Sequence, residues 1–185
     1  MTDQTMAAGF AASFAEYASD QGANRDALLA ASGLTEDDLS DQDNRIPVAA
    51  YQALIGAAIQ QTGDTALLVR HTLESRLETM SVVGQIVHTS ASLRHSLEQL
   101  NRYLHLMGDV ELPLGVERFE LLRTAGGLWI VDHLVLPPEM SFWSEVSFAR
   151  FISEFRRSFP DATFEIGMEV TYPPPPHVDQ YPDLF

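Results

Sequence analysis

Residues 79–109 read TMSVVGQIVHTSASLRHSLEQLNRYLHLMGD, and their spacing of apolar and small residues organises the prediction for the whole chain. A short apolar segment carrying Gly84 leads into a serine-rich segment, after which apolar residues recur every three or four positions. That spacing predicts two helices joined by a serine-rich segment. Ser90 or Ser92 in this segment would cap the second helix by accepting its free backbone amides. We expect Gly108 to end that helix in the left-handed conformation that glycine tolerates.

The composition predicts an ordinary globular protein. The chain has 185 residues, of which 45% are hydrophobic and 20% charged, enough for one domain with a proper core. It contains neither an apolar run of membrane-spanning length nor a secretion signal at its start, so we expect a cytoplasmic protein and no membrane partner. Cysteine is absent, which excludes disulfides and thiolate metal sites.

The charge balance argues against direct nucleic-acid binding. There are 26 acidic residues against 11 basic ones, all of them arginine, and the formal net charge is -15. Because affinity for nucleic acid comes largely from cations that neutralise phosphates, this chain alone should not bind DNA or RNA. We interpret the acidity as a solubility feature, with a basic protein partner as the alternative.

The chain before residue 79 is predicted to be entirely helical. Asn24 and Thr35 are placed to cap two short helices, and Pro47 suits the first turn of a longer one, where a missing amide costs nothing. Gly63 is expected to end that helix.

The second half of the chain has a different pattern. Residues 116–123 and 128–136 alternate around a Gly-Gly pair and predict a β-hairpin. Both faces of its second strand are apolar, so that strand is expected to be central and covered on both sides. Residues 142–159 predict a largely buried helix, and residues 163–172 a half-buried edge strand.

Together these elements predict an α+β fold. A helical amino-terminal half packs on a small, mainly antiparallel sheet, with a long buried helix between the second and third strands. Residues 1–172 are expected to form one domain. Residues 173–185 begin with four prolines that favour an extended polyproline conformation, so we interpret them as an exit linker. The alternative is a proline-rich ligand for a partner's aromatic groove.

Polar residues on the second predicted strand suggest a binding site. Asp132 and His133 lie among apolar residues on opposite faces, and buried polar groups need partners or a ligand. Aromatic residues around His133 and the positive charge of Arg150 would suit a small organic molecule with an anionic group. The predicted ligand-binding residues are Trp129, His133, Phe142, Trp143 and Arg150. Alternatively, the aromatic residues belong to the core and His133 bonds to a neighbouring backbone group.

Metal binding and catalysis find little support. His71, Glu74 and Glu78 are spaced like metal ligands along a helix, but no second half of a site accompanies them. No glycine-serine-glycine elbow supports a serine hydrolase. We therefore predict no catalytic residue, no metal and no cofactor.

Several short segments carry a family resemblance. They are IP-x-x-x-Y at 46–51, TGD-x-AL at 62–67, the Gly84 segment, SLR-x-SL-x-x-L-x-RY at 92–103 and V-x-Y-x-x-P at 170–175. In this order and spacing they resemble the amino-terminal sensor domain of AraC-type transcriptional regulators, in its arabinose-binding-domain-like branch. The resemblance spans residues 27–181.

The resemblance implies a bacterial regulatory module that binds a small-molecule effector, often dimerises and is not an enzyme. A helix-turn-helix half, which would contact DNA, normally follows and is missing from this sequence. The resemblance and the amphipathic helix in residues 93–107 together predict a homodimer whose interface includes Leu93, Leu97, Leu100 and Leu104. Two other classes stay open: a stand-alone protein-interaction module, and a small enzyme using His133 or His71.

Overall fold

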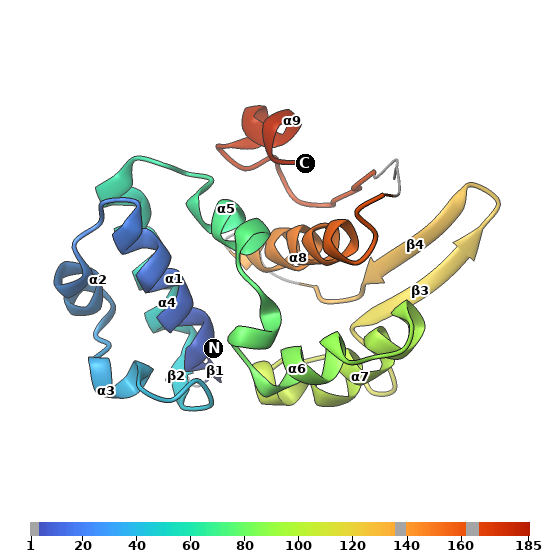
Figure 1. Ribbon diagram of the computed structural model, residues 1–185, viewed down its shortest axis with the longest axis horizontal. Coiled ribbons are helices and arrows are strands. Elements are labelled where there is room, and N and C mark those ends of the chain that lie inside the picture. The colour runs from blue at the N-terminus through green and yellow to red at the C-terminus, as the bar shows by residue number, and fades with distance from the viewer. Residues whose placement is uncertain (1–3, 136–139, 162–166) are drawn as a thin grey trace. The chain divides into compact units, whose positions relative to one another are not determined.

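The computed structural model describes residues 4–135, 140–161 and 167–185 (Figure 1). They form two compact units, each assembled from two separate stretches of chain. The first unit comprises the described residues of Met1–Thr62 and Arg76–Leu134, and the second comprises those of Gly63–Ser75 and Val135–Phe185. The α+β class is confirmed, because helices predominate and the described strands form two antiparallel pairs.

The first unit begins with helices whose ends follow local sequence signals. Its elements are β1 Thr5–Ala7, α1 Ala8–Asp20, α2 Arg25–Ser32, α3 Glu36–Leu39, β2 Arg45–Pro47, α4 Val48–Thr62, η1 Leu77–Thr79, α6 Val82–His88, α7 Leu93–Met107, β3 Phe119–Thr124 and β4 Gly127–Asp132. The Asn24 side chain accepts the amide of Ala27, and Thr35 forms a capping box with Asp38. Both predicted caps are confirmed.

A short strand pair precedes the helices and differs from the prediction. β1 pairs antiparallel with β2, with Met6 opposite Ile46, and both side chains are buried. The chain before residue 79 was predicted to be entirely helical, but α1 and α4 begin only at Ala8 and Val48, after these strands. Three residues are too few to show the alternation that marks a strand, and these partners lie about forty residues apart in the sequence.

Gly108 ends α7, but not in the predicted left-handed conformation. Its φ of -177° is extended, and it forms a β-bridge with Met6. The next amide, of Asp109, donates to the carbonyl oxygen of Thr5 at 2.8 Å. The Asp109 carboxylate in turn accepts the amide and the hydroxyl of Thr5 at 2.7 and 2.8 Å. The chain leaves α7 extended because it pairs with β1.

Two capped helices form residues 79–109, as predicted. Ser92 caps α7 by accepting the amide of His95, and α7 packs against α6, β3 and β1. Three leucines of the predicted dimer face are buried within the chain: Leu97, Leu100 and Leu104. Leu93 is half-buried. The apolar face of α7 thus belongs to the unit's own core and is not available to a second copy in this structure.

The main chain of residues 77–80 packs against two glycines. A Cβ atom on Gly9 of α1 would lie 2.1 Å from the carbonyl oxygen of Met80. A Cβ atom on Gly84 of α6 would lie 2.1 Å from the carbonyl oxygen of Leu77. Both distances are far below van der Waals contact, so only glycine permits α1 and α6 to approach this segment.

β3 and β4 form the predicted hairpin, with Phe119 opposite Asp132 and Leu122 opposite Trp129. The prediction of a central strand is wrong. Among the described residues, β4 pairs with β3 alone, and 53% of Leu128 and 36% of Trp129 are exposed. The apolar residues near the turn therefore face outward, although their pattern resembles that of a covered strand.

The second unit contains four described elements: α5 Leu67–Glu74, α8 Phe142–Ser158, η3 Val178–Gln180 and α9 Tyr181–Leu184. α5 and α8 lie side by side (Figure 1). The prediction of a long helix is confirmed at α8, whose buried positions include Ala149 and Ile152 but also Glu145 and Ser153.

The carboxyl-terminal part of this unit differs from its prediction. Within the expected strand at 163–172, residues 163–166 lie outside the described residues, and 167–172 form no strand. Residues 173–185, expected to be an extended exit linker, include η3 and α9 and belong to the second unit. The reason is that His177 is buried and contacts a carboxylate of α8.

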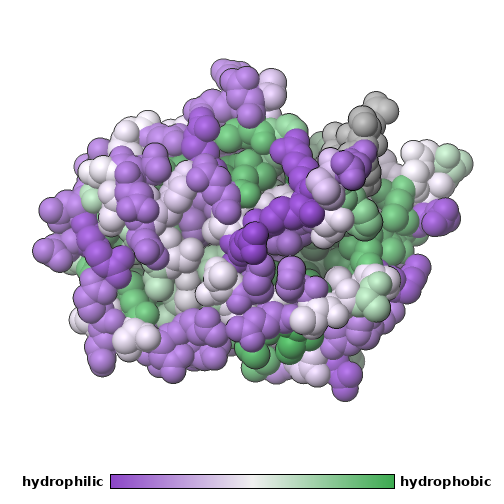
Figure 2. Space-filling view, viewed as in Figure 1, coloured by the Kyte–Doolittle hydropathy of each residue, from purple (hydrophilic) through white to green (hydrophobic). Residues whose placement is uncertain are grey.

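The surface agrees with the acidic composition. Figure 2 shows hydrophilic side chains over much of the face in view. In the described part of the chain, no helix combines the length and the apolar character needed to cross a bilayer.

Gly84→Ala should destabilise the protein by about 3 kcal/mol, because the added methyl group forces α6 away from residues 77–78. Gly56→Ala in α4 is the matched control, since its Cβ atom meets nothing within 4 Å. That change should stabilise by about 0.5–1 kcal/mol through helix propensity. Urea unfolding followed by circular dichroism measures both. Equal effects of the two substitutions would contradict the close approach at Gly84.

Candidate functional site

Asp132 has a protein partner. Nε and Nη2 of Arg118 donate to its two carboxylate oxygens, each at 3.1 Å. The side chains are 9% and 3% exposed, so this bidentate ion pair is almost entirely removed from water. The expectation that Asp132 needs a partner is confirmed, and the partner precedes β3.

His133 also has a partner, on the other face of the hairpin. Its Nε2 lies 2.9 Å from Oε2 of Glu120, and both side chains are more than one third exposed. The His133 amide donates to the carbonyl oxygen of Arg118 at 2.7 Å. Trp129 lies opposite Leu122 in the hairpin, and Val131, two positions further along β4, lies opposite Glu120. Trp129 and His133 thus both belong to the hairpin region of the first unit.

The other three predicted ligand-binding residues lie on α8 in the second unit. The rings of Phe142 and Trp143 are 5.0 Å apart between centroids. Arg150 donates through Nη1 to the carbonyl oxygen of Ser75 at 2.5 Å and through Nη2 to its hydroxyl at 2.8 Å. Because the five residues are divided between the two units, a pocket that contains all of them stays a prediction.

Three side chains of α8 bind the carboxyl-terminal end of α5. Besides Arg150, Ser153 donates to the carbonyl oxygen of Leu73 at 2.8 Å, and Arg157 donates twice to that of Ser75 at 3.1 Å. The last carbonyl groups of a helix lack partners within the helix and carry partial negative charge. The arginines satisfy both needs, so Arg150 has a structural role here.

His71 lies on α5 and is buried. Burial, and then the positive charge of Arg150, lower the pKa of His71 from 6.5 to about 4. It is therefore neutral at neutral pH. The sequence spacing of His71, Glu74 and Glu78 resembled that of metal ligands, but among the described residues no group of three potential metal-ligating side chains occurs.

A buried carboxylate forms the centre of the most distinctive polar cluster. Glu145 of α8 is 3% exposed, and its Oε1 lies 2.7 Å from Nε2 of His177, which is 7% exposed. The hydroxyl group of Tyr181 donates to the same oxygen at 2.5 Å. We call these three residues and Tyr172 the Glu145 cluster. This cluster was not predicted from the sequence. The usable signal was Glu145, an acidic residue four positions before Ala149 and so on the same, buried face of the helix.

Two polar atoms of the Glu145 cluster have unused hydrogen-bonding capacity. Nδ1 of His177 and the hydroxyl group of Tyr172 are buried, and neither has a hydrogen-bond partner among the described residues. Burial, and then the charge of Glu145, raise the pKa of Tyr172 to about 12. Burial and the hydrogen bond to Glu145 raise the pKa of Tyr181. Both tyrosines therefore keep their protons at neutral pH.

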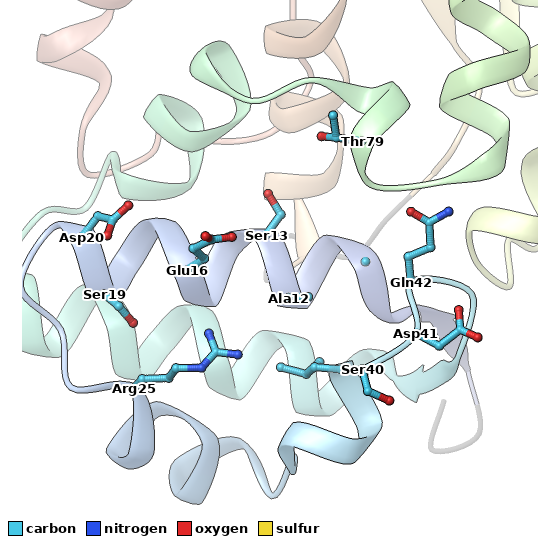
Figure 3. Close-up of a pocket in the computed structure, with 12 residues that line it drawn as sticks. Ala12, Ser13, Glu16, Ser19, Asp20, Arg25, Ser40, Asp41, Gln42 and Thr79 are labelled. Atoms are coloured by element: carbon cyan, nitrogen blue, oxygen red, sulfur yellow. The ribbon is translucent and has the colours of Figure 1, made fainter.

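The first unit also has a wide, open groove of about 970 Å³ beside α1 (Figure 3). Glu16 and Asp20 of α1 line it together with Asp41. Arg25, also in its wall, forms an ion pair with Glu36 at 2.7 Å. Small-molecule sites usually enclose most of their ligand and are largely apolar, so this open polar groove is a weaker candidate.

One family comparison matches most of the chain. The family is described as the arabinose-binding domain of AraC transcription regulators, N-terminal, and its profile covers residues 22–185. The matched span includes the complete Glu145 cluster and all five predicted pocket residues, and it begins after β1. A search of curated proteins found no match.

Asp132→Ala should cost about 3–5 kcal/mol, because it leaves the Arg118 guanidinium buried without its counter-charge. The double variant Arg118→Met, Asp132→Leu should recover most of that loss, since apolar residues of similar volume tolerate burial. Glu120→Ala is the control, and removal of this exposed pair should cost under about 1 kcal/mol. Denaturant unfolding of the wild type and the three variants measures these differences in stability. An Asp132→Ala cost as small as that of Glu120→Ala would refute the buried pair.

His71 should make the second unit less stable in acid. The unfolded chain binds a proton below a pKa of 6.5, whereas the folded chain does so only below about 4, so stability falls as pH falls between these values. Relative to His71→Gln, the wild type should lose about 2 kcal/mol more between neutral pH and about pH 5. Trp143 fluorescence in a Trp129→Phe background follows this unit. Parallel pH curves would show that His71 titrates normally.

Proposed function

Because the chain belongs to the family of amino-terminal arabinose-binding domains of AraC transcription regulators, we propose that it senses a small organic effector for transcriptional control. The observation that carries the proposal is the family match over residues 22–185. The net charge of -15 supports a division of labour in which another part of the regulator contacts DNA. The family is regulatory, and the proposal is accordingly one of binding.

An effector acts by binding one arrangement of the domain more tightly than another. In this proposal each unit contributes the predicted residues that it holds, Trp129 and His133 in the first unit and Phe142, Trp143 and Arg150 in the second. The aromatic side chains supply apolar contact area, and His133 and Arg150 supply polar groups. Each of those polar groups already has a protein partner, Glu120 and Ser75 respectively, so an effector must exchange or share these contacts.

The alternative of a small enzyme has lost support. His133 forms a surface pair with Glu120, and burial keeps His71 neutral at neutral pH. The proposal of sensing therefore rests on the family match and not on either histidine.

A homodimer is the second part of the proposal. The leucine face of α7 is buried, but the hairpin exposes Leu122 and Trp129, which lie opposite each other on one face, and exposed apolar side chains that gather together favour protein contacts. Sedimentation at micromolar concentration should give the mass of two chains. Leu122→Glu should shift the protein to one chain, whereas Leu114→Glu, at a fully exposed position, should not. A wild type that sediments as one chain throughout removes the dimer.

Thermal-shift screening tests effector sensing. A panel of small metabolites should include arabinose, which the family description names. A compound at a hundred times its dissociation constant adds about 2.7 kcal/mol, which corresponds to several degrees in Tm. His133→Ala should reduce the shift, and His95→Ala, on the exposed side of α7, should leave it unchanged. Equal shifts in wild type and His133→Ala would remove His133 from the site, and a panel without hits would count against sensing.

A further inference from the structure

The Glu145 cluster has more hydrogen-bonding capacity than its own residues use. An ionised carboxylate only accepts hydrogen bonds, so Nε2 of His177 and the hydroxyl group of Tyr181 both donate to Glu145. When Nε2 carries the only ring proton, Nδ1 is an acceptor, and this atom is buried in a side chain that is 7% exposed. A buried acceptor without a donor costs free energy, which a bound donor would recover.

The Tyr172 hydroxyl group is the second unused group. It is buried without a partner among the described residues, and the charge of Glu145 acts on it. A hydroxyl oxygen accepts as well as donates. Two acceptors therefore lie around one carboxylate, a combination that suits a ligand with several N–H donors and a positive charge.

The surroundings also favour a cation over an anion. The chain carries 26 acidic against 11 basic residues, which raises the local concentration of cations around it. Aromatic rings add to the attraction, since the rings of His177 and Tyr181 lie 5.9 Å apart, and those of Tyr181 and Phe185 lie 5.2 Å apart. Three arginines of this unit already have partners: Arg150 donates to Ser75, Arg70 to the side chain of Gln180, and Arg156 to the carbonyl oxygen of Phe185.

We propose that the Glu145 cluster is a binding site for a small molecule with a primary ammonium group, which donates to Nδ1 of His177 and to the Tyr172 hydroxyl oxygen beside the Glu145 carboxylate. The site is contained in the second unit and requires neither Trp129 nor His133. It is a second site, separate from the five predicted ligand-binding residues, and it therefore goes beyond the proposed function.

Three size-matched probes test the site directly. n-Butylamine, 1-butanol and butyrate have the same carbon chain and at neutral pH are a cation, a neutral donor and an anion. Titration of each into the wild-type protein is followed through the NMR signals of the His177 ring. n-Butylamine should shift these signals saturably with a millimolar dissociation constant, 1-butanol should bind more weakly, and butyrate should have no effect.

Two substitutions separate binding from folding. Tyr172→Phe removes only an unpartnered hydroxyl group, so it should leave the folded protein at least as stable while weakening n-butylamine about fivefold or more. Glu145→Gln should weaken it further. His95→Ala, at an exposed position of α7, is the control and should bind n-butylamine as the wild type does.

Three outcomes overturn this site. In the first, butyrate binds at least as tightly as n-butylamine, and in the second, n-butylamine binds the wild type and Tyr172→Phe with equal affinity. In the third outcome n-butylamine shifts no His177 signal, which would leave ordered water as the partner of His177 Nδ1 and the Tyr172 hydroxyl group. Failure of the site leaves effector sensing intact if the metabolite screen still yields hits sensitive to His133→Ala. Failure of the screen leaves the cluster intact if the n-butylamine titration saturates.

Discussion

The first unit depends on how closely two helices approach the main chain of residues 77–80. Gly9 and Gly84 present no side chain there, and a Cβ atom on either would lie 2.1 Å from a carbonyl oxygen. This approach brings α1 and α6 against one segment and buries Met80 and Val83 between them. α6 then positions α7, which packs against β1 and β3. Most of this unit is thus arranged around a backbone contact that tolerates no added atom.

In the second unit, polar side chains of one helix perform the corresponding task. Arg150, Ser153 and Arg157 of α8 satisfy the carboxyl-terminal end of α5, and Glu145 holds His177 and Tyr181. These bonds are buried or half-buried, so each is costly to leave unmade. The same feature makes α8 a suitable place for a binding site, because a ligand that donates to His177 and Tyr172 contacts the segment that Glu145 holds.

The sequence predicted what local chemistry determines. The caps at Asn24, Thr35 and Ser92 and the helices that follow them were correct, because a cap acts over three residues. β1 and β2 were missed, since they are three residues long and their pairing is distant in sequence. At the site, alternation showed that Asp132 needed a partner but could not identify Arg118. The Glu145 cluster escaped because its partners lie 32 and 36 residues away, in a proline-rich segment that resembled a linker.

The central claim is that this AraC-family sensor domain binds a donor-bearing small molecule at the Glu145 cluster of α8. A crystal structure of the domain soaked with n-butylamine tests it most directly. The claim predicts density for the ammonium group within hydrogen-bonding distance of Nδ1 of His177 and the hydroxyl oxygen of Tyr172. Density for the amine at Trp129 and His133 instead, or only a water molecule between His177 and Tyr172, would contradict it.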